Sequence, residues 1–363
     1  MILLHNRLKK LNQRIYPRHL FYGPDWLLLG LNNACNLHCK MCDVGNGHTE
    51  SNYSQNLTGN KPLNMPLELF KKICDEIGHF YPQTKIDYSY AEPLIYPHLL
   101  TSLDYARQKG ISTSLVTNGL KLKELAADLS VSGLKYLNVS LDGPPKTHNM
   151  IRGNPHSFEL AFEGIKRVLE LSQSEIKILV CHTITEWNYD KMIEFVNIFK
   201  SLQIKGIAFM HPNFVSSAMA LDHNKLWGNA YPVTDSSLSK MNLDNIKLPV
   251  LFEQIKEIRK IGLPFPVSFY PDLNDLNILS VYYNNHVQTI GNHCWDTFRN
   301  IMVKPNGDVI PGIGKCYKVV AGNLYQNSLK EIWNSKTLAQ LRSDLIKSGG
   351  LMPGCTRCCG SFQ

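Results

Sequence analysis

Short apolar runs alternate with amphipathic stretches from residue 26 to about residue 212. Apolar runs of this length, bounded by polar residues, are typical of buried strands in a parallel sheet. The stretches between them repeat their apolar positions at helical spacing, as in 66–80 and 158–171. The sequence therefore predicts six β-α repeats, with strands at 26–32, 85–90, 111–117, 134–141, 176–184 and 204–211.

Repeats of this kind predict an α/β fold. Right-handed crossovers between successive strands place all six in one parallel sheet. We expect the sheet to curl into a partial (β/α)6 TIM-like barrel, although an open doubly wound sheet has the same local pattern. In either arrangement the functional groups gather at the C-terminal ends of the strands.

The remaining segments divide the chain into four predicted parts. Residues 1–25 form a basic N-terminal extension, and residues 26–212 form the barrel. Residues 213–290 break the repeat and are interpreted as a bridge over the barrel mouth, where we expect substrate specificity to be determined. Residues 291–363 are predicted to form a small cysteine-rich α+β domain.

Local signals refine the last two parts. Aromatic residues of the bridge, namely Trp227, Tyr231 and Tyr270, either close over a substrate or form the core of a helical cap. In the C-terminal part, the turn residues Pro305–Gly307 predict a hairpin. One helix is expected over 328–349, ended by glycines.

Composition narrows the class of protein. Hydrophobic residues make up 44% and charged residues 19%, which is ordinary for a soluble globular protein. No apolar run is long enough to span a membrane, and the first residues do not read as a signal peptide, so we expect a cytoplasmic protein.

The net charge of +8 is uneven along the chain. The first twenty residues contain no acid and five basic residues, namely Arg7, Lys9, Lys10, Arg14 and Arg18. The segment is interpreted as a solvated basic helix packed on the domain, or as a surface that attracts anions. No nucleic-acid motif accompanies it, so no nucleic-acid partner is expected.

Ten cysteines carry the clearest chemical signal. A reducing cytosol disfavours disulfides, so clustered cysteines there indicate metal binding or catalysis. Three of them lie at 35–42 and five at 294–359, while Cys74 and Cys181 stand alone in apolar patterns typical of buried thiols.

The first group, Cys35, Cys39 and Cys42, has the spacing C-x3-C-x2-C directly after the first predicted strand. Three thiolates can bind three irons of a [4Fe–4S] cluster and leave the fourth iron open. A structural zinc ion would need a fourth ligand, which His38 or Asp43 could supply.

This motif in this place resembles the radical S-adenosylmethionine (SAM) superfamily. The resemblance implies a [4Fe–4S] cluster whose open iron binds SAM. Cleavage of SAM would then give a 5′-deoxyadenosyl radical, which abstracts a hydrogen atom from the substrate. A reduced flavodoxin or ferredoxin is the expected electron donor.

Further segments resemble the family's SAM contacts. Tyr90, Ala91 and Glu92 stand where the family has a Gly-Gly-Glu-Pro element, with both glycines replaced. The resemblance implies that this element binds the methionine amino group. Residues at the ends of the third and fourth predicted strands complete the cofactor-binding set, namely Thr117, Asn118, Ser140, Asp142 and Arg152. Arg152 is expected to pair with the SAM carboxylate.

The ends of the fifth and sixth predicted strands carry polar residues. We predict His182, Glu186 and His211 as catalytic residues that contact substrate or SAM, although a histidine at a strand end is often structural.

The second cysteine group supplies a closed ligand set. Cys294 and Cys316 flank the predicted hairpin, and Cys355 and Cys358 follow the helix, with Cys359 as an alternative to Cys358. The arrangement resembles the SPASM/twitch domains of radical SAM enzymes and implies one auxiliary [4Fe–4S] cluster. A zinc knuckle is the structural alternative.

The sequence constrains the reaction less than it constrains the family. The one-cluster tail resembles oxidoreductases that oxidise an alcohol on a sugar or aminocyclitol, so the first hypothesis is a small polar substrate. The alternative is a peptide-modifying maturase that crosslinks or epimerises a ribosomal peptide. A non-catalytic iron–sulfur scaffold is the third, and the SAM-like elements argue against it.

Overall fold

A computed structural model describes residues 2–57, 61–173, 175–312, 314 and 316–362. The strands are β1 (Trp26–Leu29), β2 (Lys85–Tyr88), β3 (Thr113–Thr117), β4 (Tyr136–Ser140), β5 (Lys177–Thr183), β6 (Gly206–Met210), β7 (Val267–Tyr270), β8 (Asn300–Val303), β9 (Asp308–Pro311) and β10 (Gly322–Asn323). They form one sheet in the order β10-β9-β8-β1-β2-β3-β4-β5-β6-β7.

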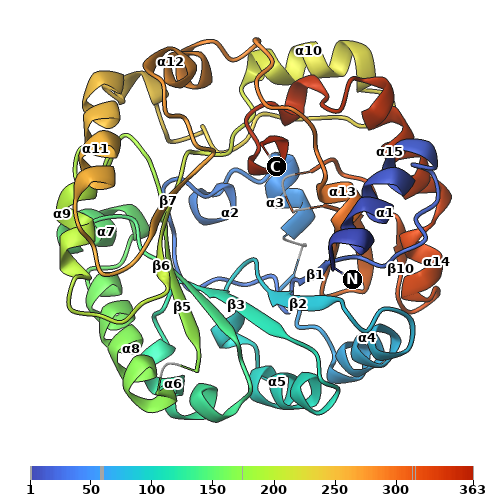
Figure 1. The fold of residues 1–363 in the computed structure, drawn as a ribbon, viewed down its shortest axis with the longest axis horizontal. Helices are drawn as coiled ribbons and strands as arrows, with labels where there is room; N and C mark the ends of the chain where they lie inside the picture. The colour runs from blue at the N-terminus through green and yellow to red at the C-terminus, as the bar shows by residue number, and fades with distance from the viewer. Residues whose placement is uncertain (1, 58–60, 174, 313, 315, 363) are drawn as a thin grey trace.

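Helices surround this sheet (Figure 1). They are α1 (Ile2–Ile15), α2 (Asp43–Asn46), α3 (Asn52–Leu57), α4 (Leu67–Phe80), α5 (Leu99–Gln108), α6 (Leu122–Val131), α7 (Pro145–Arg152), α8 (Ser157–Ser172), α9 (Met192–Ile198), α10 (Ser217–Trp227), α11 (Leu248–Lys260), α12 (Leu276–Asn284), α13 (Asp296–Arg299), α14 (Leu329–Trp333) and α15 (Lys336–Lys347). Four 3₁₀ turns complete the set, η1 (Pro93–Ile95), η2 (Leu243–Asn245), η3 (Pro353–Cys355) and η4 (Cys359–Ser361).

The six predicted strands are all present and run parallel. Alternate residues face the helices and are buried, as the pattern of β5 shows: Ile178 and Val180 are buried, while Leu179 and Cys181 are half-buried. The sheet curls with its helices outside and has free edges at β7 and β10, which confirms the partial barrel (Figure 1).

The same sheet takes in strands from the other predicted parts. From the bridge, β7 pairs in parallel with β6. In the C-terminal part, β8 pairs in parallel with β1, and the predicted hairpin joins it to β9. The cysteine-rich part is therefore attached to the barrel by main-chain hydrogen bonds, which brings it beside the first cysteine loop.

Part of the bridge packs on the C-terminal part. The rings of Trp227 and Tyr231 lie 6.2 Å apart, and Tyr231 lies 5.4 Å from the ring of Tyr317. Tyr231 is buried and donates a hydrogen bond to Asp344 in α15 (2.9 Å). These two aromatic residues thus form the core of a cap, the second of the two alternatives, while Tyr270 is exposed in β7.

The helix predicted over 328–349 is two helices. Ser328 begins α14 with a capping box to Glu331, and Ser335 caps α15 by accepting a hydrogen bond from Leu338 N–H. A serine side chain satisfies the free N–H groups of a helix start, so Ser335 favours a break where apolar spacing alone indicates continuity. The predicted glycine stop is present, since Gly349 and Gly350 have φ of 81° and 100°.

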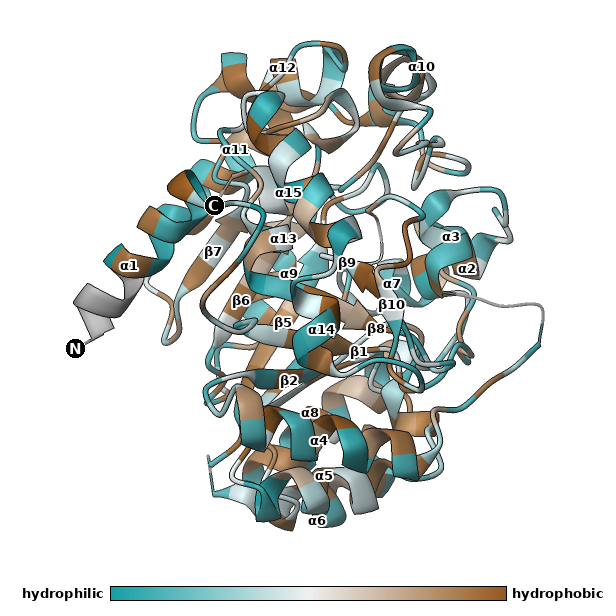
Figure 2. Cartoon of the chain, turned by 90° about the vertical axis from the view of Figure 1, so that its right-hand side faces the viewer, coloured by the Kyte–Doolittle hydropathy of each residue, from teal (hydrophilic) through white to brown (hydrophobic). Residues whose placement is uncertain are grey.

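No helix in the described part of the chain combines the length and the apolar character needed to cross a bilayer. The hydropathy view in Figure 2 shows apolar and polar segments alternating along nearly every helix. This alternation matches helices that each lay one face on the sheet.

Candidate functional site

The first cysteine group lies in the loop between β1 and α2, at the C-terminal end of its strand. Cys39 is buried, and Cys35 and Cys42 are half-buried. The loop packs closely on itself, because a Cβ at Gly45 would stand 2.6 Å from the backbone nitrogen of Cys39. Lys40 N–H also donates to the carbonyl of Ile151 in α7 (2.9 Å). The three thiols are therefore held on one rigid loop.

Nitrogen donors approach two of these sulfurs. Arg152 Nη1 lies 3.7 Å from Cys39 Sγ, and Asn118 Nδ2 lies 3.9 Å from Cys35 Sγ. Burial raises the pKa of Cys39 to about 12, with Arg152 opposing the shift and Cys42 adding to it. Thiols that hold their protons this strongly become thiolates when metal cations displace the protons. The three sulfurs of this loop, two of them approached by nitrogen donors, fit an iron–sulfur cluster.

The turn after β2 has an unusual backbone. Tyr90 and Ala91 have φ of 68° and 48°, in the left-handed region that favours glycine. These are the two positions where the resembled element has glycines, so the conformation is present although the residues differ. Glu92 N–H then donates to the carbonyl of Ala34, which ties the turn to the cysteine loop (3.1 Å).

Replacing Ala91 by Gly is expected to preserve or raise stability. Left-handed backbone costs an L-residue on the order of 1 kcal/mol, which Gly avoids, less the extra entropy of its unfolded chain. We expect Ala91→Gly to change the free energy of unfolding by about 0 to +1 kcal/mol. Ala91→Val should lower it by more than about 1 kcal/mol, because a β-branched residue fits this region poorly. Thermal unfolding of both variants checks the ordering, and a Gly variant as unstable as the Val variant would contradict it.

Glu92 is buried and joins the ends of two strands. Its carboxylate accepts hydrogen bonds from Thr117 Oγ1 (2.6 Å), Asn118 N–H (2.7 Å) and Leu94 N–H (3.0 Å). Asn118 continues the chain of contacts by donating to Asn36 Oδ1 in the cysteine loop (2.8 Å). The structure thus brings Glu92, Thr117 and Asn118 together beside Cys35.

Asp142 and Arg152 form a buried ion pair. Arg152 Nη2 lies 2.5 Å from Asp142 Oδ2, and Asp142 Oδ1 accepts from Thr183 N–H (2.8 Å). Burial is the largest single influence and acts to raise the pKa of Asp142. Arg152, His182, His148 and the Thr183 hydrogen bond together outweigh burial and hold this pKa below its ordinary value. The Arg152 guanidinium is therefore engaged by Asp142 and Cys39, whereas the sequence predicted a SAM carboxylate as its partner. Ser140 is the last residue of β4. It is half-buried and lies on the opposite face of the strand from Val139.

The three predicted catalytic residues are not brought together with the cysteine loop. His182 is buried between the rings of Phe195 and Phe209, and burial lowers its pKa to about 4. His211 hydrogen-bonds Tyr283 through Nδ1 (2.8 Å), and burial lowers its pKa to about 3. Both lie in aromatic surroundings under helices.

Glu186, the third of these residues, binds two asparagines of the bridge. Its carboxylate accepts hydrogen bonds from Asn242 N–H (2.8 Å) and from the side chain of Asn245. The structure thus shows a structural contact for each of the three, and their catalytic roles stay predictions.

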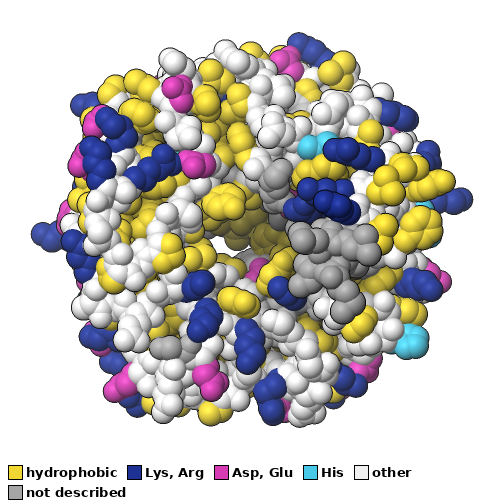
Figure 3. All heavy atoms as spheres, in the orientation of Figure 1, with side chains coloured by type: hydrophobic (Ala, Val, Ile, Leu, Met, Phe, Trp, Pro, Cys, Tyr) yellow, Lys and Arg dark blue, Asp and Glu magenta, His cyan; other side chains and the backbone are white. Residues whose placement is uncertain are grey.

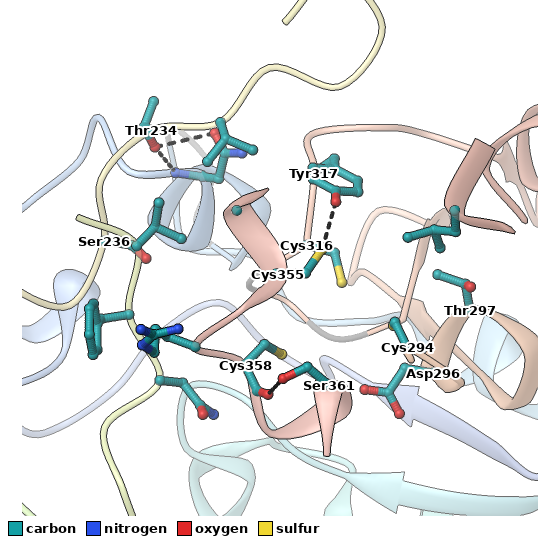
Figure 4. A pocket seen from close by; sticks show the side chains of 18 residues that line it. Thr234, Ser236, Cys294, Asp296, Thr297, Cys316, Tyr317, Cys355, Cys358 and Ser361 are labelled. Carbon is teal, nitrogen blue, oxygen red and sulfur yellow. Dashed lines mark hydrogen bonds between the residues drawn. The ribbon is translucent and has the colours of Figure 1, made fainter. Parts of the chain in front are cut away.

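The second cysteine group lines one cavity. Cys294, Cys316, Cys355 and Cys358 come from three segments, the last two from the same C-terminal turn, and point toward the same space (Figure 4). A Cβ at Gly312 would stand 3.0 Å from Cys316 Sγ, so this sulfur reaches back to the position directly after the hairpin. The four predicted ligands are thus the four cysteines that converge.

The spacing of the thiolates distinguishes a cluster from a single zinc ion. The thiolates of a cubane cluster each bind a different iron and stand further apart than ligands that share an ion. Tyr317 also contacts Cys355, with 2.8 Å between the hydroxyl oxygen and the sulfur (Figure 4).

Cys358 is expected to be the fourth ligand, because it lines the cavity while its neighbour Cys359 does not. Cys358→Ser should therefore lower the iron content by about four per chain after anaerobic reconstitution, and Cys359→Ser should leave it unchanged. Iron analysis of the two variants, which differ by one position, makes each the control of the other. Equal losses in both would refute the assignment.

One connection between the two cysteine sites was missed at the sequence level. The hydroxyl of Tyr90 accepts a hydrogen bond from Gly314 N–H, in the loop that carries Cys316 (2.9 Å). Its aromatic ring packs with Leu57, Met302 and Ile310. The available signal was the large side chain of Tyr90 in a position that the family fills with glycine, because such a side chain needs a contact elsewhere in the structure.

Comparisons with known proteins agree with this geometry. A family model described as the radical SAM superfamily matches residues 30–197, and one described as an iron–sulfur cluster-binding domain, SPASM, matches residues 294–359. GTP 3′,8-cyclase of Peptoclostridium acidaminophilum is 26% identical over 270 residues, which cover 70% of this chain and 78% of that protein.

Other similarities are more partial or more distant. Molybdenum cofactor biosynthesis protein 1 of Bos taurus is 29% identical over 193 residues, or 52% of this chain, and the chain spans only 28% of its length. The crystal structure of Streptococcus suis SuiB bound to precursor peptide SuiA has a TM-score of 0.64 at 17% identity. It covers 97% of this chain, which in turn covers 75% of SuiB, so the two share a fold.

The cysteine loop at the barrel mouth, the converging tail cysteines and both family matches lead to one conclusion. This chain belongs to the radical SAM superfamily and carries a C-terminal SPASM domain, and it is an enzyme that binds S-adenosylmethionine and iron–sulfur clusters.

Proposed function

We propose that this enzyme removes a hydrogen atom from a peptide or protein segment, in the manner of a peptide maturase. The observation that carries the proposal is the extent of the shared fold. The likeness to SuiB, which was crystallised with its precursor peptide, runs over 97% of this chain and so takes in most of the bridge and tail as well as the barrel. Bridge and tail are the parts that border the barrel mouth.

The shape of the barrel supports a chain-like substrate. β7 lies at an edge of the sheet, so one side of its backbone has no neighbouring strand among the ten described. Ser268 and Tyr270 of β7 are exposed. Figure 3, in the orientation of Figure 1, shows a hollow at the centre of the molecule, bordered by hydrophobic side chains. An extended peptide can lie along a free strand edge and place one side chain into such a hollow.

The roles of the chain's own residues follow from the site. Cys35, Cys39 and Cys42 would hold the cluster that binds SAM, and Cys294, Cys316, Cys355 and Cys358 one auxiliary cluster. When bound, SAM and its cluster supply the one-electron chemistry that removes the hydrogen atom. The residues proposed to line SAM are the eight predicted from the sequence, namely Tyr90, Ala91, Glu92, Thr117, Asn118, Ser140, Asp142 and Arg152. Of these, Glu92, Asn118 and Arg152 contact the cysteine loop.

A small polar substrate is the second candidate, and the inner wall of the barrel favours it. Asp87 and Ser114 are paired neighbours on β2 and β3, and Asn138 Nδ2 donates to Ser114 Oγ (3.1 Å). Burial raises the pKa of Asp87, with Ser114 and Ser89 opposing the shift. A carboxylate of raised pKa is a competent base for a hydroxyl group, as the alcohol oxidation expected from the sequence requires.

Deuterium transfer separates the two candidates. Extract from cells grown in D2O is divided into a polypeptide fraction and a small-molecule fraction, and each is incubated with reconstituted enzyme, SAM and dithionite. We expect deuterium in 5′-deoxyadenosine from the polypeptide fraction, and its loss after protease digestion of that fraction to free amino acids. Transfer from the small-molecule fraction alone would overturn the peptide proposal and support the second candidate.

A further inference from the structure

Helix α1 turns its apolar side away from the protein. Leu8, Leu11 and Ile15 follow one another at helical spacing and are 56%, 53% and 56% exposed. Asn12 and Gln13 of the same helix are buried. A helix of a soluble protein ordinarily does the reverse, burying its apolar stripe and exposing its polar residues. The exposed stripe therefore needs a partner outside the described chain.

The polar residues on the buried side of the helix bond to the segment that follows it, and these bonds fix the orientation of the helix. Asn12 Nδ2 donates to the carbonyl of His19 (2.8 Å), and Asn12 Oδ1 accepts from Phe21 N–H (2.8 Å). Gln13 Nε2 donates to the Tyr22 hydroxyl (2.7 Å), and Lys9 pairs with Asp25 at 2.5 Å. Rolling the helix to hide its apolar stripe would break these contacts, so the exposure is built into the extension.

Positive charge borders the stripe. Arg7, Lys10 and Arg14 are exposed, and helical spacing places them along one flank of Leu8, Leu11 and Ile15. The first acidic residue of the chain is Asp25. In Figure 2, α1 leans out from the body of the protein, and Figure 3 shows dark blue and yellow side chains next to one another on that side.

Aromatic side chains extend the apolar surface beyond the helix. Tyr16 and Phe21 are 61% and 75% exposed, and their rings contact edge to face with 6.3 Å between centroids. Exposed aromatic rings next to an apolar stripe and basic residues are the composition of helices that lie in the interface of a bilayer.

We propose that α1 docks this enzyme on an anionic lipid surface, with Leu8, Leu11 and Ile15 in the interface and Arg7, Lys10 and Arg14 at the lipid phosphates. The charge decides against a second copy as the occupant, because two α1 helices packed stripe to stripe would bring their basic flanks together. An anionic bilayer satisfies the apolar stripe and the cations at once. The docking is peripheral and reversible, since a single helix of this kind lies on a membrane without spanning it.

Sedimentation with sucrose-loaded vesicles tests the proposal on the full-length, anaerobically reconstituted protein. We expect binding to vesicles of phosphatidylcholine and phosphatidylglycerol at 7:3, and at least about tenfold weaker binding to pure phosphatidylcholine, because the basic residues are attracted only to an anionic surface. High salt should weaken the binding to the anionic vesicles.

Two variants address the two halves of the proposal. Leu8→Ser/Leu11→Ser/Ile15→Ser removes the stripe, and Lys10→Glu/Arg14→Glu reverses the flank. Each should lower vesicle binding on the order of tenfold or more while leaving 5′-deoxyadenosine formation intact, because these exposed residues lie outside the SAM site.

Matched controls use exposed residues elsewhere. Val131→Ser/Leu226→Ser and Lys123→Glu/Lys200→Glu change similar side chains on other faces and should bind vesicles like the wild type. Wild-type protein that fails to sediment with anionic vesicles overturns the proposal. A stripe variant that binds vesicles like the wild type also overturns it. So does a wild-type protein that is a dimer and does not bind lipid, if the stripe variant is a monomer.

Discussion

Replacing Cys35, Cys39 and Cys42 together by alanine is expected to remove about four irons per chain and to abolish the formation of 5′-deoxyadenosine from SAM. The physical reason is that these three thiols share one rigid loop, held by Gly45 and by the Lys40–Ile151 hydrogen bond. The remaining tail site has four converging cysteines, and a cluster held by all four would offer no open iron to SAM. Iron analysis and chromatography of the products, after anaerobic reconstitution with dithionite, measure both effects.

The matched control for this variant is Cys74→Ala. Cys74 is also a buried thiol, but it lies in α4 within the hydrophobic core. It should keep its full iron content and its SAM cleavage. A triple variant that still made 5′-deoxyadenosine would show that SAM is cleaved elsewhere.

The second large effect is expected on stability. Arg152→Ala leaves the Asp142 carboxylate, which is 0% exposed, without its cation. Breaking one side of a buried ion pair costs about 3–5 kcal/mol, because the remaining charge has lost both water and partner. We expect Tm to fall by about 5–10 °C, measured by thermal unfolding of the anaerobic protein.

The control for this prediction is a double variant. Arg152→Met/Asp142→Asn removes both charges at once, so it should cost less than Arg152→Ala alone. A double variant that loses as much as the sum of the two single changes would show that the pair is not coupled. Iron content should be followed in parallel, since Arg152 also approaches Cys39.

The elements that were predicted correctly are those set by residues adjacent in the chain. The six parallel strands, the cysteine loop after β1 and the hairpin β8–β9 follow from alternation, spacing and turn residues that lie next to one another in the chain. The pairing of β8 with β1 joins residues far apart in sequence, and no local pattern encodes it. For that reason the tail was predicted as a separate small domain, although its first strand belongs to the barrel's sheet.

Side-chain direction explains the weaker site predictions. His182 lies on the same face of β5 as Ile178 and Val180, which is the face that the helices cover. Strict alternation along the strand would therefore have placed it in the core. Arg152 is predicted to meet the SAM carboxylate because guanidinium suits carboxylates. In the structure it pairs with the Asp142 carboxylate, and its contact with SAM stays a prediction. The left-handed backbone of Tyr90 and Ala91 could not be predicted, because neither residue type favours it.

The most direct test of two distinct clusters is electron paramagnetic resonance of the dithionite-reduced protein with and without SAM. The Cys355→Ala/Cys358→Ala variant retains the barrel site alone, and its signal should shift when SAM is added. The Cys35→Ala/Cys39→Ala/Cys42→Ala variant retains the tail site alone, and its signal should be the same with and without SAM. A SAM-dependent shift in the second variant, or its absence in the first, would contradict the assignment of SAM to the barrel cysteines.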